Sequence, residues 1–311
     1  MKKIAMFIAT ALVAVTVAHA QDVNAVVEIY NNGAMALDMG DKQEALTQFQ
    51  TALAEAEALG EAGAEIVEQC KAVIPHLLIS IAKDDLRENN FDSAYELLVK
   101  AKDTAVLYDN IEKEAEAVGL INQTLMQKAN GFLNAKDFAN AITVYEQLMT
   151  LDPTNDKAAL RLGQCYASTG NFDEAEKAFN VAAANGQEKQ AYKQLSNLYF
   201  RKAQAAFKAK SLQEAIDFAN KSNEYLENAN AYKIAGLAAF ELGKKEEALP
   251  FLEKYVELSP NAKDANQMKN NIAATALQLG DKEKAKLYFE QLITDPKFGP
   301  GAQQMLKQIN K

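Results

Sequence analysis

Residues 159–182 read ALRLGQCYASTGNFDEAEKAFNVA, two short helix-forming segments on either side of a glycine turn. Gly170 is followed five residues later by Ala175, which opens the second segment. Three other glycines stand at the same distance from an alanine: Gly40 from Ala45, Gly243 from Ala248, and Gly280 from Ala285. Weaker copies begin at a polar residue: Asn89 before Ala94, Lys136 before Ala141, and Lys210 before Ala215. Self-similarity at a period of tens of residues predicts an array of repeated helix pairs.

The chemistry of this spacing supports the same interpretation. A glycine ends the first helix because it adopts the left-handed conformation without a steric penalty. A small alanine in the second helix then lets the two antiparallel helices approach closely. Asn89 tolerates the left-handed conformation, whereas Lys136 and Lys210 do so less readily, so we expect those two turns to differ.

The unit at 159–182 resembles the tetratricopeptide repeat, whose pattern places Trp, Leu, Gly and Tyr on the first helix and Ala and Phe on the second. The residues that match this pattern are Leu162, Gly163, Tyr166, Ala175 and Phe179. Ala159 stands at the tryptophan position, and the closing proline is missing. The resemblance implies an all-α fold, an α-solenoid of antiparallel helix pairs forming a right-handed superhelix. It would hold about seven repeat units and a C-terminal capping helix.

The repeat spacing is uneven along the chain. Long spacings near the N-terminus predict lengthened helices at 63–88 and 110–135, the first kinked at Pro75. Pro250 predicts another kink. We expect a signal peptide at 1–20, tetratricopeptide-like units with lengthened helices at 21–121, a tetratricopeptide array at 122–298, and a capping helix at 299–311.

The first twenty residues have the pattern of a secretory signal peptide. Lys2 and Lys3 precede an apolar run, and Ala18-His19-Ala20 matches a cleavage site, so we expect cleavage before Gln21. An uncleaved membrane anchor is the alternative, but the apolar run is short for a span. The pattern predicts export, with a periplasm as the simplest destination and the extracellular space as the alternative.

The charge of the chain disfavours two classes of partner. Removing Lys2 and Lys3 from the 33 basic residues leaves 31 against 42 acidic ones, a net charge of −11. Nucleic-acid affinity comes largely from neutralised phosphates, and anionic membranes attract the same basic residues. We therefore expect no nucleic acid as a partner, and no later segment is apolar enough to span a membrane.

Few reactive groups are available for catalysis. The mature chain would hold one histidine, His76, and two cysteines, Cys70 and Cys165, which we expect to be separate buried thiols. A lone histidine lacks the partners that a metal site needs. The chain shows no phosphate-binding glycine loop and no hydrolase motif. We therefore predict no enzyme activity, no cofactor and no metal.

The resemblance implies a concave groove lined by one face of the first helices. At the matching positions lie Gln123, Asn130, Asn134, Gln164, Phe200, Gln204, Phe207, Lys233, Phe240, Asn270 and Gln278. Amides pair with both backbone donors and acceptors, and aromatic rings serve as anchors. The sequence therefore predicts a non-enzymatic scaffold in the cell envelope that binds a protein or peptide in this groove. The alternative is a glycan-binding or envelope-assembly accessory protein.

Overall fold

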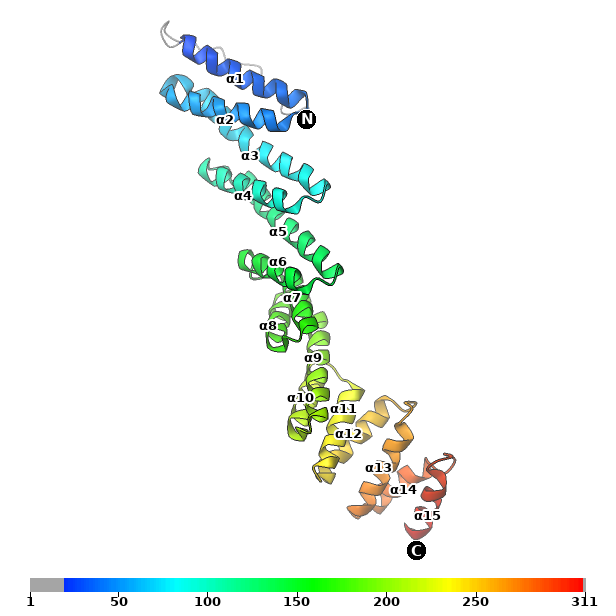
Figure 1. The fold of residues 1–311 in the computed structure, drawn as a ribbon. Helices are drawn as coiled ribbons and strands as arrows, with labels where there is room; N and C mark the ends of the chain where they lie inside the picture. Colours follow the sequence, from blue (N-terminus) through cyan, green and yellow to red (C-terminus); the bar gives the residue numbers. More distant parts are fainter. Residues whose placement is uncertain (1–19, 310–311) are drawn as a thin grey trace. The chain divides into compact units, whose positions relative to one another are not determined.

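A computed structural model describes residues 20–309, and within that range it contains fifteen α-helices and no strand (Figure 1). Apart from Ala20, which begins the first helix, the predicted signal peptide lies outside the described residues. No helix in the described range is long and apolar enough to cross a membrane. The chain divides into two compact units, one ending at Pro153 and the other beginning at Thr154.

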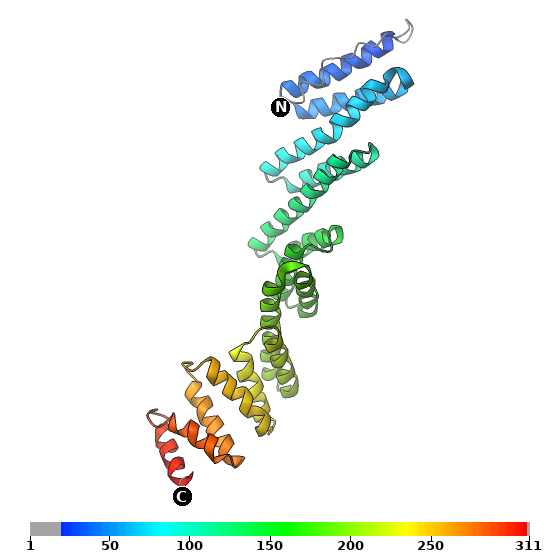
Figure 2. The same ribbon diagram turned by 180° about the vertical axis from the view of Figure 1, so that it is seen from behind.

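The N-terminal unit is a stack of three helix pairs, visible from both sides in Figures 1 and 2. A short 3₁₀ turn at Gly60–Gly63 joins the first two pairs. The helices are α1 (Ala20–Asp38), α2 (Lys42–Ala58), α3 (Ala64–Arg87), α4 (Phe91–Leu107), α5 (Ile111–Asn134) and α6 (Phe138–Leu151). The helices α3 and α5 confirm the two lengthened helices that the sequence predicts.

The C-terminal unit is a stack of four helix pairs followed by one more helix. Its helices are α7 (Asp156–Thr169), α8 (Phe172–Ala182), α9 (Glu188–Lys208), α10 (Leu212–Tyr225), α11 (Ala229–Glu241), α12 (Lys245–Leu258), α13 (Ala265–Gln278), α14 (Lys282–Glu290) and α15 (Gly299–Ile309). A kinked segment at Ala183–Gln187, in which Asn185 and Gly186 have non-helical backbone angles, supplies the extra residues between α8 and α9. In each unit the helices form antiparallel pairs, which confirms the predicted all-α solenoid.

Each pair closes with the same left-handed turn. The four glycines of the repeated phrase have φ between 76° and 86°. The amide after each turn donates to the carbonyl five residues earlier, as from Asn171 to Tyr166 at 2.9 Å. This hydrogen bond satisfies one of the carbonyls left open at the helix end.

The expectation that the lysine turns differ is wrong. Lys136 and Lys210 have φ of 59° and 62°, and each is followed by the same five-residue hydrogen bond. A left-handed lysine costs about 1–2 kcal/mol. The closing hydrogen bonds and the packing of both helices determine the turn despite this cost.

The alanines of the phrase lie at the closest contact between paired helices. All seven, from Ala45 to Ala285, are fully buried. A Cβ added at Gly163 would lie 2.6 Å from the Phe179 ring, and one at Gly236 would lie 2.6 Å from Leu252. Small residues on both helices therefore set the separation within a pair, as the sequence predicts.

Two prolines lie within helices, Pro75 in α3 and Pro250 in α12. The kinks there, like the domain boundaries at 121/122 and 298/299, stay predictions. The last helix, α15, packs Ala302, Met305 and Leu306 onto the same hydrophobic cluster as Phe289 of α14. Its position on this cluster is compatible with a cap.

Candidate binding surfaces

Several first helices of successive pairs touch one another inside each unit. In the N-terminal unit α3 contacts both α1 and α5, and in the C-terminal unit α9 contacts both α7 and α11. We call the row of predicted groove residues along these helices the inner face of a unit. The inner face of the N-terminal unit carries Gln123, Asn130 and Asn134, all on α5. The inner face of the C-terminal unit carries Gln164, Phe200, Gln204, Phe207, Lys233, Phe240, Asn270 and Gln278.

On the N-terminal unit only part of this row is exposed. Gln123 and Asn134 face solvent. Asn130 is half-buried, and its amide oxygen accepts a hydrogen bond of 2.7 Å from the Tyr145 hydroxyl of α6. This oxygen therefore helps to hold α5 and α6 together.

On the C-terminal unit the aromatic residues differ in exposure. Phe240 is 39% exposed, and Gln204 faces solvent. Phe200 and Phe207 are half-buried and pack on an alanine-rich cluster formed by α9 to α12. That cluster has alanine at both close-contact positions of the α9–α10 pair, Ala203 and Ala219. The partial burial of the two rings is compatible with the space that these small side chains leave.

The polar members of the C-terminal inner face have contacts within the chain. Lys233 forms a 3.0 Å ion pair with Asp264 and lies 5.1 Å from the centre of the Tyr255 ring. Gln164 accepts a hydrogen bond of 3.2 Å from Arg161, and Asn270 is half-buried. Gln278 faces solvent. The accessible core of this surface is therefore Phe240 and Gln204, flanked by Phe200 and Phe207.

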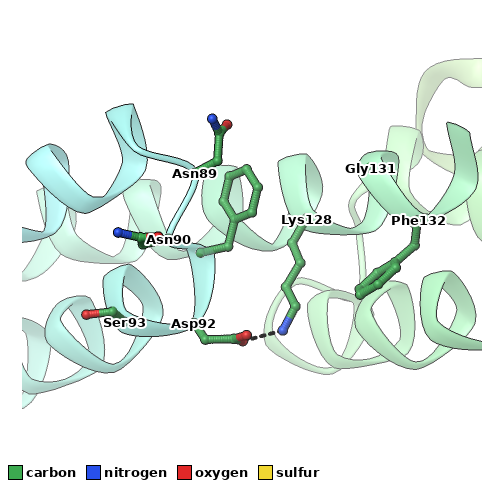
Figure 3. A pocket seen from close by; sticks show the side chains of 8 residues that line it. Asn89, Asn90, Asp92, Ser93, Lys128, Gly131 and Phe132 are labelled. Carbon is green, nitrogen blue, oxygen red and sulfur yellow. Dashed lines mark hydrogen bonds and ion pairs between the residues drawn. The ribbon is translucent and has the colours of Figure 1, made fainter. Parts of the chain in front are cut away.

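A pocket lies in the N-terminal unit where the α3–α4 turn meets α5 (Figure 3). The cavity has a volume of about 570 Å³ and is lined by residues 89–93 together with Lys128, Gly131 and Phe132. The Lys128 ammonium group pairs with the Asp92 carboxylate across it (Figure 3). On the turn itself, Ser93 Oγ donates to Asp85 at 2.6 Å, and Asn90 Nδ2 donates to Glu88 at 3.2 Å. Sequence reasoning missed this site, which we call the Phe91 pocket.

Three family models described as tetratricopeptide repeat match residues 132–199, 221–263 and 267–294. The chain is a tetratricopeptide repeat protein. The first segment runs from the end of α5 into α9, the second from the end of α10 past α12, and the third over α13 and α14.

Solved structures of other repeat proteins are similar to parts of this tetratricopeptide chain. A crystal structure of MamA is 20% identical, covers 58% of this chain and 94% of its own, and has a TM-score of 0.37. YrrB, described as having an unusual peptide-binding site, is 19% identical over 58% of this chain and 91% of its own, with a TM-score of 0.35. A thermophilic protein from Thermus thermophilus, TTC0263, is 16% identical over 61% of this chain and 98% of its own, with a TM-score of 0.28.

In this tetratricopeptide protein, burial is the main cause of the shifted pKa values of Cys70, Cys165 and His76. Burial raises the pKa of Cys70 to about 12 and that of Cys165 to about 11, which keeps both thiols protonated and unreactive. Burial, followed by the charge of Lys113, lowers the pKa of His76. The described residues include no group of three or more His, Cys, Asp or Glu side chains that could hold a metal ion.

Glu116 is the centre of an ion-pair network between α3 and α5. Its carboxylate accepts hydrogen bonds from Lys113 at 2.8 Å and Lys83 at 2.7 Å, and these lower its pKa to about 2. A carboxylate held ionised in this way cannot act as a general acid near neutral pH. The network stabilises helix packing and offers no catalytic proton.

Proposed function

We propose that this tetratricopeptide repeat protein is a non-enzymatic scaffold that binds a protein or peptide on the inner face of its C-terminal unit. The observation that carries the proposal is the exposed ring of Phe240 on α11, a helix that directly contacts the α9 helix of Gln204. An aromatic ring supplies binding energy at low entropic cost, and a neighbouring amide pairs with an extended backbone.

The partly buried rings of Phe200 and Phe207 extend this surface along α9. They already rest on the alanine-rich cluster, so a ligand that covers them buries apolar area without ordering new side chains. The half-buried Lys233 is paired with Asp264, so the surface carries little net charge at its centre. An uncharged peptide with apolar side chains is the ligand that these groups fit.

The test uses a peptide selected from a random display library on the intact mature chain. Replacing both Phe207 and Phe240 with alanine is expected to weaken its binding at least tenfold, as for other aromatic anchors. Leu287→Ala is the control, because Leu287 is an exposed apolar residue of α14. Equal affinities of the double variant and the control for the peptide would contradict the proposal.

We further propose that the chain acts outside the cytoplasm, in the periplasm. The proposal is supported by the Lys2-Lys3 start, the apolar run and the Ala18-His19-Ala20 motif. Sequencing the N-terminus of the protein purified from its source cells tests it. A first residue of Gln21 is expected, and recovery of the uncleaved N-terminus would contradict cleavage.

Glycan binding is the second candidate function. Tyr192 on α9 is 37% exposed, and its ring lies 5.5 Å from the ring of Tyr225 on α10. The two rings are tilted by 57° to each other, so the exposed face of Tyr192 alone is the surface on which a sugar ring could stack. Calorimetry with envelope polysaccharides, using the intact chain and Tyr192→Ala, separates this function from peptide binding.

A further inference from the structure

Two turns of the molecule share one sequence and one ion pair. Asn90-Phe91-Asp92 follows α3, and Asn171-Phe172-Asp173 follows α7. Asp92 pairs with Lys128 of α5, and Asp173 pairs with Lys202 of α9 at 2.9 Å. The two ion pairs fix which residues correspond on the helices that follow. Gln127, Gly131 and Phe132 of α5 correspond to Arg201, Ala205 and Ala206 of α9.

In the C-terminal unit the phenylalanine of this turn is covered by an arginine from the same chain. The Arg201 guanidinium carbon lies 5.1 Å from the centre of the Phe172 ring. Its Nη1 also donates a hydrogen bond of 3.1 Å to the carbonyl oxygen of Ala167, near the end of α7. A guanidinium over an aromatic face within about 6 Å is attracted by the ring quadrupole.

In the N-terminal unit the corresponding position leaves a cavity. Gln127, in place of Arg201, faces solvent and carries no charge. Gly131 has no side chain, and a Cβ added there would meet no atom within 4 Å. The neighbouring Lys128 is engaged by Asp92, as Figure 3 shows. The Phe91 pocket therefore contains a phenylalanine ring equivalent to Phe172, but no guanidinium group equivalent to that of Arg201.

The Phe91 pocket is also the more acidic of the two sites. Asp85 and Glu88 stand on its turn where the other turn has Tyr166 and Thr169. Both carboxylates are close to the pocket, because they accept hydrogen bonds from its lining residues Ser93 and Asn90. The backbone carbonyl of Leu86 corresponds to the Ala167 carbonyl, which accepts the hydrogen bond from Arg201 in the other unit. A planar guanidinium fits this combination better than an ammonium, because it stacks and donates in several directions.

We propose that the Phe91 pocket binds the guanidinium of an arginine side chain on a protein partner, in the place that Arg201 takes in the C-terminal unit. The proposal rests on the proposed function only in assigning the arginine to a protein. The pocket uses residues of the α3–α4 turn and of α5 in the N-terminal unit, whereas the proposed peptide surface uses Gln204 of α9 and Phe240 of α11 in the C-terminal unit. Binding at the pocket and binding at the C-terminal inner face are therefore separate events.

The experiment titrates the intact mature chain with N-acetyl-arginine methylamide while recording backbone amide resonances. We expect saturable shifts at Ser93 and Gly131, with a dissociation constant on the order of millimolar, as for one side chain. The citrulline analogue, which has the same shape without the charge, is expected to bind at least tenfold more weakly. Gln127→Arg, which fills the site from within, is expected to abolish the response to arginine.

Two further variants keep the test informative. Gln147→Arg adds the same charge to an exposed position of α6 and is expected to leave arginine binding unchanged. Phe91→Leu removes the ring, and Leu212 at the corresponding position of the α9–α10 turn shows that leucine is compatible with this fold. Equal shifts with citrulline, no saturable shift at all, or full binding by Gln127→Arg would each overturn the proposal. None of these outcomes bears on peptide binding at Phe240.

Discussion

The α3–α4 and α7–α8 turns show which residues build this fold and which residues vary on it. Both have Asn-Phe-Asp, a buried alanine two residues later, and an ion pair to the following helix. They differ at the position of Arg201, whose guanidinium lies over Phe172, because Gln127 stands at the corresponding position of α5. The shared residues fix the backbone, whereas the Arg201 position and the acidic Asp85 and Glu88 distinguish the two sites.

The same contrast extends to the contacts between first helices. In the N-terminal unit, Lys83 of α3 pairs with Glu116 of α5. In the C-terminal unit the corresponding residues are Gln164 and Gln190, two neutral amides. Packing of the N-terminal unit therefore depends on charge at a place where packing of the C-terminal unit does not.

The largest expected effect comes from the buried alanine that follows each of the two turns. Ala94→Leu and Ala175→Leu should each destabilise their unit by about 1–3 kcal/mol, because both alanines are fully buried between paired helices. Urea unfolding measures the loss, with Ala54→Leu on an exposed position of α2 as the control. A free energy of unfolding in urea equal to that of the control, for either variant, would refute the close helix contact at that turn.

The next largest effect is the pH dependence of the stability of the N-terminal unit, which contains Glu116. The pKa of Glu116 is about 2 in the fold against an ordinary 4.5, so its stabilisation is present above pH 4.5 and is lost as the pH falls through about 2. Partial exposure screens the pairs, so we expect the contribution to be about 1 kcal/mol. Glu116→Gln should reduce the difference in unfolding free energy between pH 7 and pH 2. An unchanged difference would show that Glu116 is not the group responsible.

A smaller effect is expected when the covered turn is made to resemble the open one. Arg201→Gln removes the contact with Phe172 and the hydrogen bond to Ala167, and should cost about 0.5–1 kcal/mol. Arg161→Gln is the control, since this substitution removes the same charge at an exposed position of α7. Equal urea midpoints for the two variants would mean that Arg201 does not stabilise the turn.

The smallest effect concerns the turn residue itself. Asn89 has φ of 62° where Gly170 has φ of 86°, and asparagine tolerates this conformation better than most residues. Asn89→Gly should therefore change stability by only a few tenths of a kcal/mol, whereas Lys210→Gly should stabilise by about 0.5 kcal/mol, because the entropy of glycine offsets part of the relieved left-handed cost. A larger gain at Asn89 than at Lys210 in urea unfolding would contradict this ranking.

The features of the fold that depend on local conformation could be predicted from the sequence. Glycine turns and buried alanines follow from φ and side-chain size, so the helix pairs and the long helices α3 and α5 could be predicted. The lysine turns were misjudged, because packing of two whole helices outweighs the preference of one residue. The lysines show that a repeated backbone overrides a local cost when several contacts agree.

The surfaces could be predicted only in part. The positions of the inner-face residues follow from the helix period, but their partners are less visible in the sequence. Lys233 meets Asp264, 31 residues away, and Asn130 meets Tyr145 on the second helix of its own pair. The Phe91 pocket was missed because Gln127 lies 36 residues after Phe91, whereas Arg201 lies 29 residues after Phe172. The longer helices hide this correspondence until the ion pairs are located.

The central claim is that the two Asn-Phe-Asp turns occupy equivalent positions in the fold, and that Arg201 covers one of them whereas no guanidinium covers the other. A crystal structure of the Gln127→Arg variant tests it most directly. The introduced guanidinium should lie over the Phe91 ring, within about 6 Å of its centre, as Arg201 lies over Phe172. A guanidinium directed into solvent, with the Phe91 ring still open, would contradict the equivalence of the two sites.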